Sequence, residues 1–496
     1  MEIAWLEWSD LAFDRAQAEN KPVLLSLTTG WSDGCSVMDR TTYADPGVVS
    51  LIDAQFIPVR VDADRRPDLN ERYNLGGWPT TALLTSDGHM LTGATFLNPD
   101  EMTKMLRHVA TACRDRAAEI SARSVSVRSA RQPGPSLSAD PSLHAAHSPQ
   151  LVDVVPRFRS LLIERFDPHH GGFGSAPKLP HPDALLFALS VCGESEDAQL
   201  SRIVDLTLDR MGALWDEEEG GFFRYADAAD WSGASTEKTL EDNAALLHVA
   251  VEAAVRGCRQ SRDRAARLVQ WIKSAMADRS SGGFYNARTP GGVDKAMYVD
   301  RNAMMVGAFI RAAALFDDIW LRDFALKSLE AVIVPAYRPG AGVGHAGHDG
   351  LAPAVRGLLT DQIHVASAVI WAHAATGQLP YSMLALELMQ FAVRQMWDDP
   401  SDAFRDRAET DDPVVPFELN CVAVCVLDRL AVLTGDAAHH DRARMILRSL
   451  HARFGELDLF GAPYALAVLE VIERRPPAGL ELAPVDWQLS GVKPPV

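Results

Sequence analysis

The hydrophobic pattern of this 496-residue chain changes about a quarter of the way along it. In the first part, short apolar runs such as 22–27 and 56–61 have the length of buried strands and alternate with helical segments. From about residue 149 onward, apolar residues recur at the three- and four-residue spacing of amphipathic helices. The pattern predicts an α/β domain over 1–113 and an all-α domain over 149–496.

The first region has the element order of a small α/β sandwich. After a leading helix at 10–19, the predicted order is β, α, β, α, β, β, α. Ser86-Asp87-Gly88 is a hairpin turn signal between the last two strands. The strands are expected at 22–27, 56–61, 81–84 and 90–96, and the helices near residue 35, at 46–54, at 67–73 and from 98 onward.

Residues 114–148 differ from both flanking regions because they are rich in Ser, Ala, Arg and Pro. A segment of this composition has too few apolar groups to offset the entropy lost on ordering. We therefore expect a flexible linker between the two domains.

The third region predicts twelve helical segments joined by connections that alternate between short and long. The long connections repeat a motif of Asp followed by Gly-Gly-Phe, as in 167–173, 216–222 and 278–284, at intervals of about 50 to 60 residues. Six helical hairpins with their long loops on one rim describe an (α/α)6 toroid of the six-hairpin glycosidase type. The segments are expected to start near residues 149, 182, 197, 237, 260, 299, 319, 358, 380, 416, 438 and 460.

In a toroid, the first turns of the even-numbered segments line a funnel at one rim, and here these turns are polar. Carboxylates that face one another suit glycosidic acid/base chemistry, and His, Arg and Tyr suit sugar isomerisation or epimerisation. The catalytic candidates are Glu237, Glu241 and Asp242. The candidates for ligand binding are Lys178, His181, Arg224, Tyr225, Lys238, Asn243, Asp300, Asp361, His364, Glu418 and Asn420.

A structural explanation competes with this functional one. An acid in the first turn caps a helix and offsets its dipole, so a single acid there is better explained as a cap than as a catalyst. The cluster 237–243 is a stronger signal, because its charged residues are expected to share one helix face. For that cluster, a buried ion network and a binding site both stay open.

The stretch Ser32-Asp33-Gly34-Cys35 follows a predicted strand and opens a predicted helix, as in a thioredoxin active site. Pro79, before a later strand, is expected to form a cis peptide bond with Trp78 opposite this stretch. Dithiol exchange needs a thiolate and a second thiol, and Ser32 stands where the first cysteine is expected. Ser32, Cys35 and Pro79 therefore predict a degenerate redox site. A helix N-terminus favours a reactive thiolate, yet a buried, inert thiol is our preferred interpretation of Cys35.

Composition limits the partners. The net charge of −18 repels phosphate backbones and anionic membranes, so we expect no nucleic acid or membrane partner. Six scattered cysteines do not suggest a disulfide framework, and the first residues lack the pattern of a signal peptide. No segment reaches the length of a membrane span. These features predict a cytoplasmic protein.

Signals for a metal or a cofactor are weak. His345, His348 and Asp349 form a short cluster in a Gly-rich stretch, but no CxxC or HExxH accompanies it. A solvated loop is our preferred interpretation. No Gly-rich phosphate loop ending in Lys-Ser/Thr and no GxSxG motif occurs either. We expect neither a metal nor a cofactor.

Four stretches give the chain a specific resemblance. These are 56–68, Gly76-Gly77-Trp78-Pro79, 171–178 and Glu237-Lys238. With these residues, the chain resembles the spermatogenesis-associated, thioredoxin-domain-containing family over nearly its whole length. The resemblance implies a thioredoxin-like domain joined to an (α/α)6 toroid similar to glycosidases and N-acylglucosamine 2-epimerases.

The chain departs from the pattern of that family at several motif positions. The family motif Cys-His-Trp-Cys-His-Val-Met is 32–38 here, without its first cysteine and both histidines. Phe223 and Ser235 stand where the family has further histidines. Proton transfer that used those histidines is not expected. The residues that remain are Lys178, Arg224, Tyr225, Glu237, Lys238, Asp242 and Asn420.

Three functions follow as hypotheses. The first is a protein without dithiol redox activity whose toroid funnel binds or processes a carbohydrate-like, polar small molecule. If it is an enzyme, sugar isomerase/epimerase or glycoside hydrolase chemistry is expected, and disulfide oxidoreductase chemistry is not. The second is a non-catalytic assembly protein with a protein partner. The third is a monothiol redox protein that uses Cys35.

Overall fold

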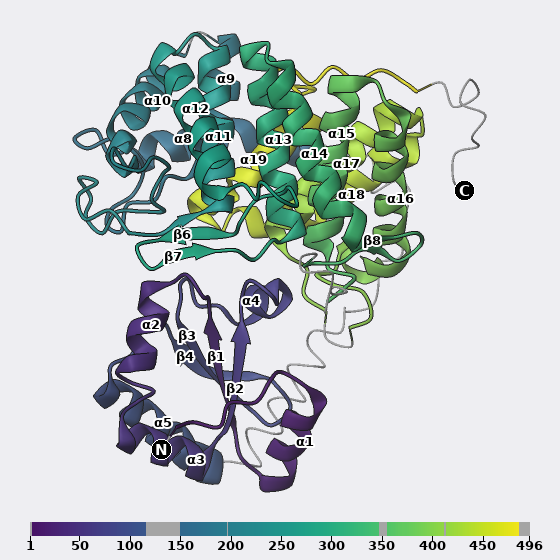
Figure 1. Ribbon diagram of the computed structural model, residues 1–496. Coiled ribbons are helices and arrows are strands. Elements are labelled where there is room, and N and C mark those ends of the chain that lie inside the picture. The colour runs from purple at the N-terminus through teal and green to yellow at the C-terminus, as the bar shows by residue number, and fades with distance from the viewer. Residues whose placement is uncertain (1, 116–148, 196, 347–354, 411–412, 486–496) are drawn as a thin grey trace. The chain divides into compact units, whose positions relative to one another are not determined.

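The computed structural model describes residues 2–115, 149–195, 197–346, 355–410 and 413–485 (Figure 1). The chain divides into two compact units, Met1–Leu137 and Ser138–Val496. Most of the predicted linker lies outside the described residues, so its flexibility and the domain limits at 113 and 149 stay predictions. Among the described helices, none is long and apolar enough to cross a membrane.

The first unit is a four-stranded sheet with strand order β2-β1-β3-β4 and helices on both faces (Figure 1). β1 runs parallel to β2 and antiparallel to β3, and β3 runs antiparallel to β4. The strands are β1 (Val23–Thr28), β2 (Ile57–Asp62), β3 (Thr80–Leu84) and β4 (Met90–Ala94). The helices are α1 (Asp10–Glu19), α2 (Asp33–Arg40), α3 (Pro46–Gln55), α4 (Pro67–Tyr73) and α5 (Pro99–Asp115).

Side-chain alternation along β1 explains the two helical layers. Leu24 packs in one apolar cluster with residues of α3 and α5. Its neighbours Val23 and Leu25 point to the other face, where they pack with residues of α1 and α4. Because successive side chains of a strand alternate between faces, a central apolar strand needs a helical layer on each side. The predicted α/β sandwich is confirmed.

The second unit is an (α/α)6 toroid, and all twelve predicted helical segments are present. Six inner helices form a ring in which each contacts the next and the last contacts the first. They are α9 (Pro182–Ser195), α11 (Leu240–Val255), α13 (Val299–Phe316), α15 (Leu359–Thr376), α17 (Phe417–Thr434) and α19 (Ala462–Val471). The outer helices are α8 (Val154–Arg165), α10 (Ala198–Arg210), α12 (Arg259–Trp271), α14 (Ile319–Ala336), α16 (Leu379–Met396) and α18 (Ala437–Phe454), and the short α7 (Pro149–Val152) precedes α8.

Burial separates the inner helices from the outer ones. The inner helix α13 buries twelve of its 18 residues, so its apolar surface extends nearly all the way round. The outer helix α12 buries five of its 13 residues, on a single stripe. A helix that is apolar on most sides must be covered by neighbours on most sides, whereas an amphipathic helix covers others. This difference places the even-numbered predicted segments inside the ring.

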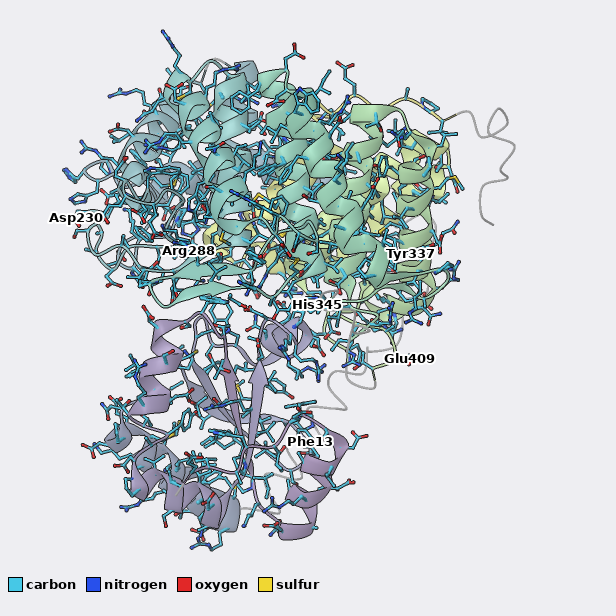
Figure 2. All side chains as sticks on the ribbon, viewed as in Figure 1. Phe13, Asp230, Arg288, Tyr337, His345 and Glu409 are labelled. Carbon is cyan, nitrogen blue, oxygen red and sulfur yellow. The ribbon has the colours of Figure 1, made fainter. Side chains whose placement is uncertain are left out.

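The long connections gather at the end of the ring where the inner helices begin, which we call the N-terminal rim. Figure 2 shows Asp230, Arg288, Tyr337, His345 and Glu409 along it, each from a connection that precedes an inner helix. The rim carries short strands: β5 (Lys238–Thr239), β6 (Ala287–Thr289), β7 (Gly292–Asp294), β8 (Tyr337–Arg338), β9 (Gly342–Val343), β10 (Trp397–Asp398) and β11 (Ala403–Phe404). It also carries single turns: η1 (Met211–Leu214), η2 (Ile272–Met276), η3 (Asp399–Ser401) and η4 (Asp458–Gly461).

The repeated Asp…Gly-Gly-Phe loops share one backbone structure. In the loop 216–222, Asp216 N donates to Gly221 O and Gly220 N donates to Asp216 O, at 3.0 and 2.9 Å. The loops that begin at Asp167 and Asp278 repeat both bonds. Gly221 has φ of +81°, and a Cβ there would lie 2.7 Å from Trp271, so the motif requires glycine.

A side-chain amide ties each of four rim loops to its inner helix. The amide of Asn302 accepts from Phe284 N at 2.7 Å and donates to Phe284 O and Tyr298 O at 3.0 and 2.9 Å. The same three bonds are made on α11, α15 and α17. The four amides, which we call the rim amides, belong to Asn243, Asn302, Gln362 and Asn420.

Replacing a rim amide should destabilise the toroid. We expect Asn302→Ala to lower the free energy of unfolding by about 3 kcal/mol, because the buried N–H and C=O of Phe284 lose the amide that pairs with them and Tyr298 O loses one of its two bonds. Denaturant unfolding followed by tryptophan fluorescence measures this change. Gln199→Ala, which removes an exposed amide on α10, is the control and should change it by less than about 0.5 kcal/mol. Equal stability of the two variants would contradict the structural role.

Candidate functional site

Carboxylates mark the first turn of five of the six inner helices. None of these acids is an N-cap, since α11 is capped by the hydroxyl of Thr239 and the N-caps of α13, α15 and α17 make no side-chain cap bond. The acids are Asp183 on α9, Glu241 and Asp242 on α11, Asp300 on α13, Asp361 on α15 and Glu418 on α17. The ring thus brings the predicted acids to one rim.

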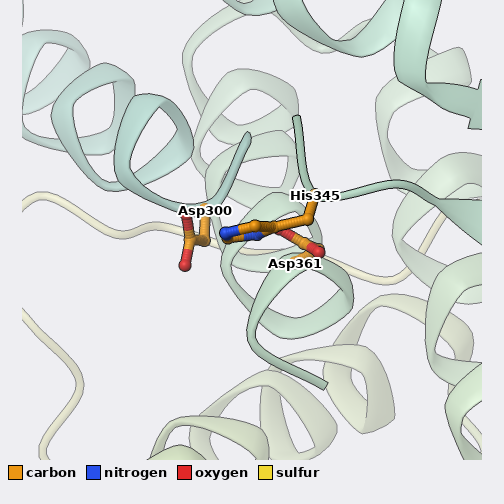
Figure 3. A group of neighbouring side chains, drawn as sticks. All are labelled: Asp300, His345 and Asp361. Atoms are coloured by element: carbon orange, nitrogen blue, oxygen red, sulfur yellow. The ribbon is translucent and has the colours of Figure 1, made fainter. Parts of the chain in front are cut away.

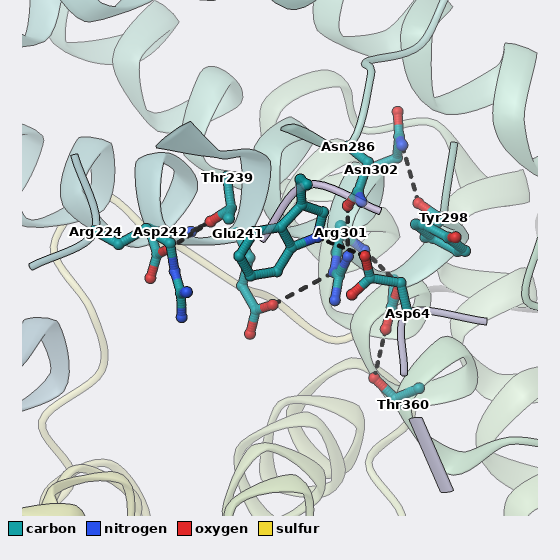
Figure 4. A network of polar contacts seen from close by, with 12 residues as sticks. Asp64, Arg224, Thr239, Glu241, Asp242, Asn286, Tyr298, Arg301, Asn302 and Thr360 are labelled. Carbon is teal, nitrogen blue, oxygen red and sulfur yellow. Dashed lines mark hydrogen bonds and ion pairs between the residues drawn. The ribbon is translucent and has the colours of Figure 1, made fainter. Parts of the chain in front are cut away.

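On the α11 side of the rim, Arg224 joins two of the predicted catalytic acids, Asp242 and Glu237, and Figure 4 shows Arg224 next to Asp242. Its Nε donates to Asp242 Oδ2 at 3.0 Å, and its Nη1 donates to Glu237 Oε2 at 3.3 Å. Thr239 Oγ1 donates to the same oxygen of Asp242 at 2.5 Å. Glu237 is buried, whereas the side chain of Asp242 keeps 34% of its surface exposed. Asp242 is therefore the more accessible of the two acids.

The prediction that the charged residues of 237–243 share one helix face is wrong. We predicted that this segment begins the helix, but α11 begins at Leu240. Lys238 and Thr239 instead form β5, which pairs with β6 through Lys238 and Arg288. Strand pairing with the next rim loop competes with helix extension, and the Thr239 cap then fixes the helix start. Glu237 still reaches Asp242 through Arg224.

A second arginine links α11 to α13. Arg301 Nε lies 3.4 Å from Glu241 Oε2, and its Nη1 donates to Asn286 Oδ1 (Figure 4). Asn286 in turn donates to Asp294 Oδ2 at 2.7 Å. The side chain of Glu241 is 52% exposed, which makes it the most accessible of the three predicted catalytic acids. Two arginines and exposed carboxylates together form a surface that suits a polyhydroxylated ligand.

Between α13 and α15, three buried side chains converge (Figure 3). His345 Nδ1 lies 2.9 Å from Asp361 Oδ1, and Asp300 lies beside them. Burial raises the pKa of Asp361 to about 6, and the nearby Asp300 carboxylate adds to the effect against the opposing influence of His345. Burial also acts on Asp300, but His345, Arg301 and His364 outweigh it and hold its pKa below the usual value. Sequence analysis placed His345 in a solvated loop, so this grouping was missed.

The predicted ligand-binding lysines hold rim loops instead of facing solvent. Lys178 Nζ donates to Asp167 Oδ2 at 2.9 Å and to Gly174 O at 3.2 Å. Lys238 Nζ makes the equivalent bonds to Asp216 Oδ2 at 2.5 Å and Gly220 O at 2.8 Å. Both lysine side chains are at most 3% exposed. Their ammonium groups are therefore engaged within the fold.

Two other predicted ligand residues, Asn243 and Asn420, are rim amides. Both N–H groups of each amide donate to backbone carbonyls, so neither has a donor to offer a ligand. The hydrogen bonds thus explain these residues by the fold alone. A signal was present in the sequence, because an amide recurs near the start of four even-numbered segments.

The remaining predicted residues lie on or beside the same rim. Burial and the nearby Lys178 lower the pKa of His181 to about 4, so it is neutral at pH 7. His364 is half-buried near Asp300, and burial lowers its pKa. Tyr225 is half-buried and Glu418 is exposed. Asp183, which sequence analysis did not single out, has its pKa raised to about 6 by burial.

Below the first turns, a buried ion network was also missed. Arg311 on α13 pairs with Glu252 on α11 at 2.7 Å, and Arg429 on α17 pairs with Glu470 on α19 at 2.6 Å. His248 contacts Arg311, and burial together with this guanidinium holds the pKa of His248 well below its usual value. The charges are paired across neighbouring inner helices, which is the condition for burying them.

In the first unit, the loops that carry the predicted degenerate redox residues lie close together. Trp78–Pro79 is a cis peptide bond, and a Cβ on Gly34 would lie 3.2 Å from Pro79 Cδ, so the two loops are adjacent. Ser32 caps α2 by accepting from Cys35 N at 3.5 Å. Cys35 is 4% exposed, and burial raises the pKa of its thiol. These features agree with a shielded, unreactive cysteine.

Comparison with known sequences finds relatives for both regions of the chain. A family model named Thioredox_DsbH, described as "Protein of unknown function, DUF255", matches residues 1–131. Spermatogenesis-associated protein 20 of Homo sapiens is 27% identical over 303 residues, which cover 58% of this chain and 38% of that protein. The Rattus norvegicus protein is 28% identical over 307 residues, with the same coverage. The matched region therefore spans little more than a third of these relatives.

Comparison with solved structures finds the toroid. Cellobiose 2-epimerase from Spirochaeta thermophila has a TM-score of 0.55 and 16% identity, covering 68% of this chain and 98% of that one. D-mannose isomerase has a TM-score of 0.57 and 12% identity, covering 66% and 98%. A GH76 alpha-mannanase of Bacteroides thetaiotaomicron has a TM-score of 0.54 and 12% identity, covering 65% and 96%. At these identities the likeness shows the fold, and the predicted (α/α)6 toroid is confirmed.

The buried lysines make a testable contribution to stability. Lys238→Met should lower the free energy of unfolding at pH 7 by about 3 kcal/mol, because Asp216 keeps a partly buried charge without its partner. Lys327→Met, on the exposed side of α14, is the control and should have little effect.

The Lys238–Asp216 ion pair also predicts how the stability of the protein depends on pH. Burial raises the pKa of Asp216, but the Lys238 bond and backbone N–H donors outweigh it, and the net pKa is lowered. Because the pKa of Asp216 is lower in the folded state than in the unfolded state, the ion pair adds fully to the free energy of unfolding above the unfolded-state pKa, near 4. This contribution is lost as the pH falls further. The difference between wild type and Lys238→Met should thus shrink below about pH 4 in denaturant titrations. A difference that stays constant with pH would contradict the ion pair.

Cys35 should react slowly in the folded protein. With iodoacetamide at pH 8, we expect Cys35 to be alkylated at least about tenfold more slowly than the partly exposed Cys258, because burial shields the thiol and raises its pKa. Peptide mass spectrometry of timed samples measures both rates, and unfolding in guanidinium should equalise them. Rapid alkylation of Cys35 in the native state would instead favour a monothiol role.

Proposed function

Because the chain belongs to the family of spermatogenesis-associated protein 20, joining a thioredoxin-like domain to an (α/α)6 toroid, we propose that its toroid binds a carbohydrate-like ligand at the N-terminal rim. The observation that carries the proposal is the accessible carboxylate pair, Glu241 and Asp242, between Arg224 and Arg301. Carboxylates accept hydrogen bonds from sugar hydroxyls, and guanidinium groups donate them. The named sugar epimerase and isomerase with this fold support the ligand class.

If the protein is an enzyme, acid/base catalysis on the sugar is the chemistry that the rim supports. Isomerisation and epimerisation need a base that removes a proton next to a carbonyl, and glycoside hydrolysis needs an acid and a base. Glu241 and Asp242 offer acceptor oxygens on the accessible side, and Arg224 bonds to both Asp242 and Glu237.

The thioredoxin-like unit is proposed to act without disulfide chemistry. One buried sulfur with a raised pKa cannot both attack a disulfide and resolve the mixed disulfide. We propose that this unit serves as a structural or docking module. An assembly protein with a protein partner is the second candidate, and the loss of motif residues in both domains favours it.

Sugar binding tests the proposal. D-mannose, cellobiose and a uronic-acid disaccharide are titrated into the full chain by isothermal calorimetry. At least one should bind, and Glu241→Gln and Asp242→Asn should each weaken that binding by about tenfold or more, because each removes a charged hydrogen-bond acceptor. Asp263→Asn, an exposed acid near the start of the outer helix α12 and therefore away from the N-terminal rim, is the matched control and should leave affinity unchanged.

Two outcomes would reject the proposal. A folded protein that binds none of these sugars would exclude the rim as a site for this ligand class. Binding that is equally strong in Glu241→Gln, Asp242→Asn and wild type would place the ligand elsewhere. Copurification of a stable protein partner with no sugar binding would instead favour the assembly function.

A further inference from the structure

The group formed by Asp300, His345 and Asp361 has the geometry of a small-ion site. One possible ligand atom from each residue lies within 4.8 Å of the other two. The residues are 8%, 2% and 0% exposed. Figure 3 shows the imidazole of His345 between the two carboxylates. Of the described residues, this is the one group that brings three such ligands together in this way.

Three separate elements hold the group in place. Asp300 lies in the first turn of α13, where it accepts from Arg301 N at 2.8 Å and from Thr360 Oγ1 at 2.9 Å. His345 follows β9, and its backbone is fixed by bonds with Val299 and Val355 at 2.9 and 3.0 Å. Asp361 lies in the first turn of α15. The side chains are thus positioned by backbone pairing and helix starts.

Charge and hydrogen bonding in the group are incomplete without an ion. Two carboxylates are buried next to one imidazole, and Arg301 also acts on Asp300, so two ionised carboxylates with a neutral imidazole would leave one negative charge unbalanced. Asp361 Oδ2 is buried, and it has no hydrogen-bond partner among the described residues. Buried carboxylate oxygens are rarely left unsatisfied in folded proteins, and a bound cation would satisfy this oxygen and balance the charge.

We propose that Asp300, His345 and Asp361 bind one divalent transition-metal ion of the Zn²⁺ or Mn²⁺ class. One imidazole nitrogen and two carboxylate oxygens suit these ions better than Ca²⁺ or Mg²⁺, which prefer sites built from oxygen alone. Three protein ligands also leave a coordination position open, as in catalytic rather than structural zinc sites. The metal site is independent of the proposed sugar binding, because its ligands are a different set from Glu241 and Asp242.

The test uses the metal alone. The full chain is stripped with EDTA and titrated with ZnCl₂ and MnCl₂ in separate calorimetric experiments, and bound metal is counted by mass spectrometry after gel filtration. We expect one ion per chain and a higher Tm with the preferred ion. Asp300→Asn and Asp361→Asn should each weaken binding by at least about tenfold. Asp183→Asn, an acid in the equivalent turn of α9, is the matched control and should bind as wild type does.

A measurement on the wild type covers the case in which a variant fails to fold. Crystals soaked in Zn²⁺ should give an anomalous difference peak between Asp300, His345 and Asp361. No stoichiometric binding of either ion, an unchanged affinity in both variants, or an anomalous peak elsewhere would overturn the inference. In those cases, a protonated His345 paired with the carboxylates would explain the group. Failure of sugar binding would leave the metal result unaffected.

Discussion

The N-terminal rim of the toroid depends on the hydrogen bonds of the rim amides. An inner helix ends its hydrogen-bond ladder at its first turn, and the loop before it carries polar backbone that must also be satisfied. One amide satisfies the loop and ties it to the helix, because Asn302 pairs with both backbone groups of Phe284 and adds a second bond to Tyr298 O, which also accepts from Asn302 N. The same three bonds recur on four consecutive inner helices, so each of these loops is tied to the start of its helix in the same way.

The fold could be predicted from the sequence because its signals are local or periodic. Helical periodicity located all twelve segments, and the repeated Gly-Gly-Phe loops predicted the ring. The cis bond before Pro79 and the burial of Cys35 followed from the thioredoxin-like layout. The short rim strands were not predicted, since two-residue strands such as β5 exist only through pairing with another loop. The early helix start at Glu237 was wrong for the same reason.

The site was only partly predictable, because residue type does not separate a scaffold role from a ligand role. Lys178 and Lys238 were expected to face a ligand, yet each holds an aspartate 11 or 22 residues earlier in the chain. Asn243 was also expected to bind a ligand, yet its amide holds a rim loop. His345 was missed because its partner Asp361 lies 16 residues further on, in the first turn of the next inner helix. Buried lysines and amides build the rim, and arginines and carboxylates occupy its accessible part.

The central claim is that the accessible charges of the N-terminal rim, and not the thioredoxin-like unit, contact a small polar ligand. Hydrogen–deuterium exchange with mass spectrometry, with and without saturating cellobiose or D-mannose, tests it most directly. The account predicts slower exchange in residues 237–243 and 298–302, and no change in residues 23–40 around Cys35. Protection confined to the first unit, or to the opposite ends of the inner helices, would contradict it.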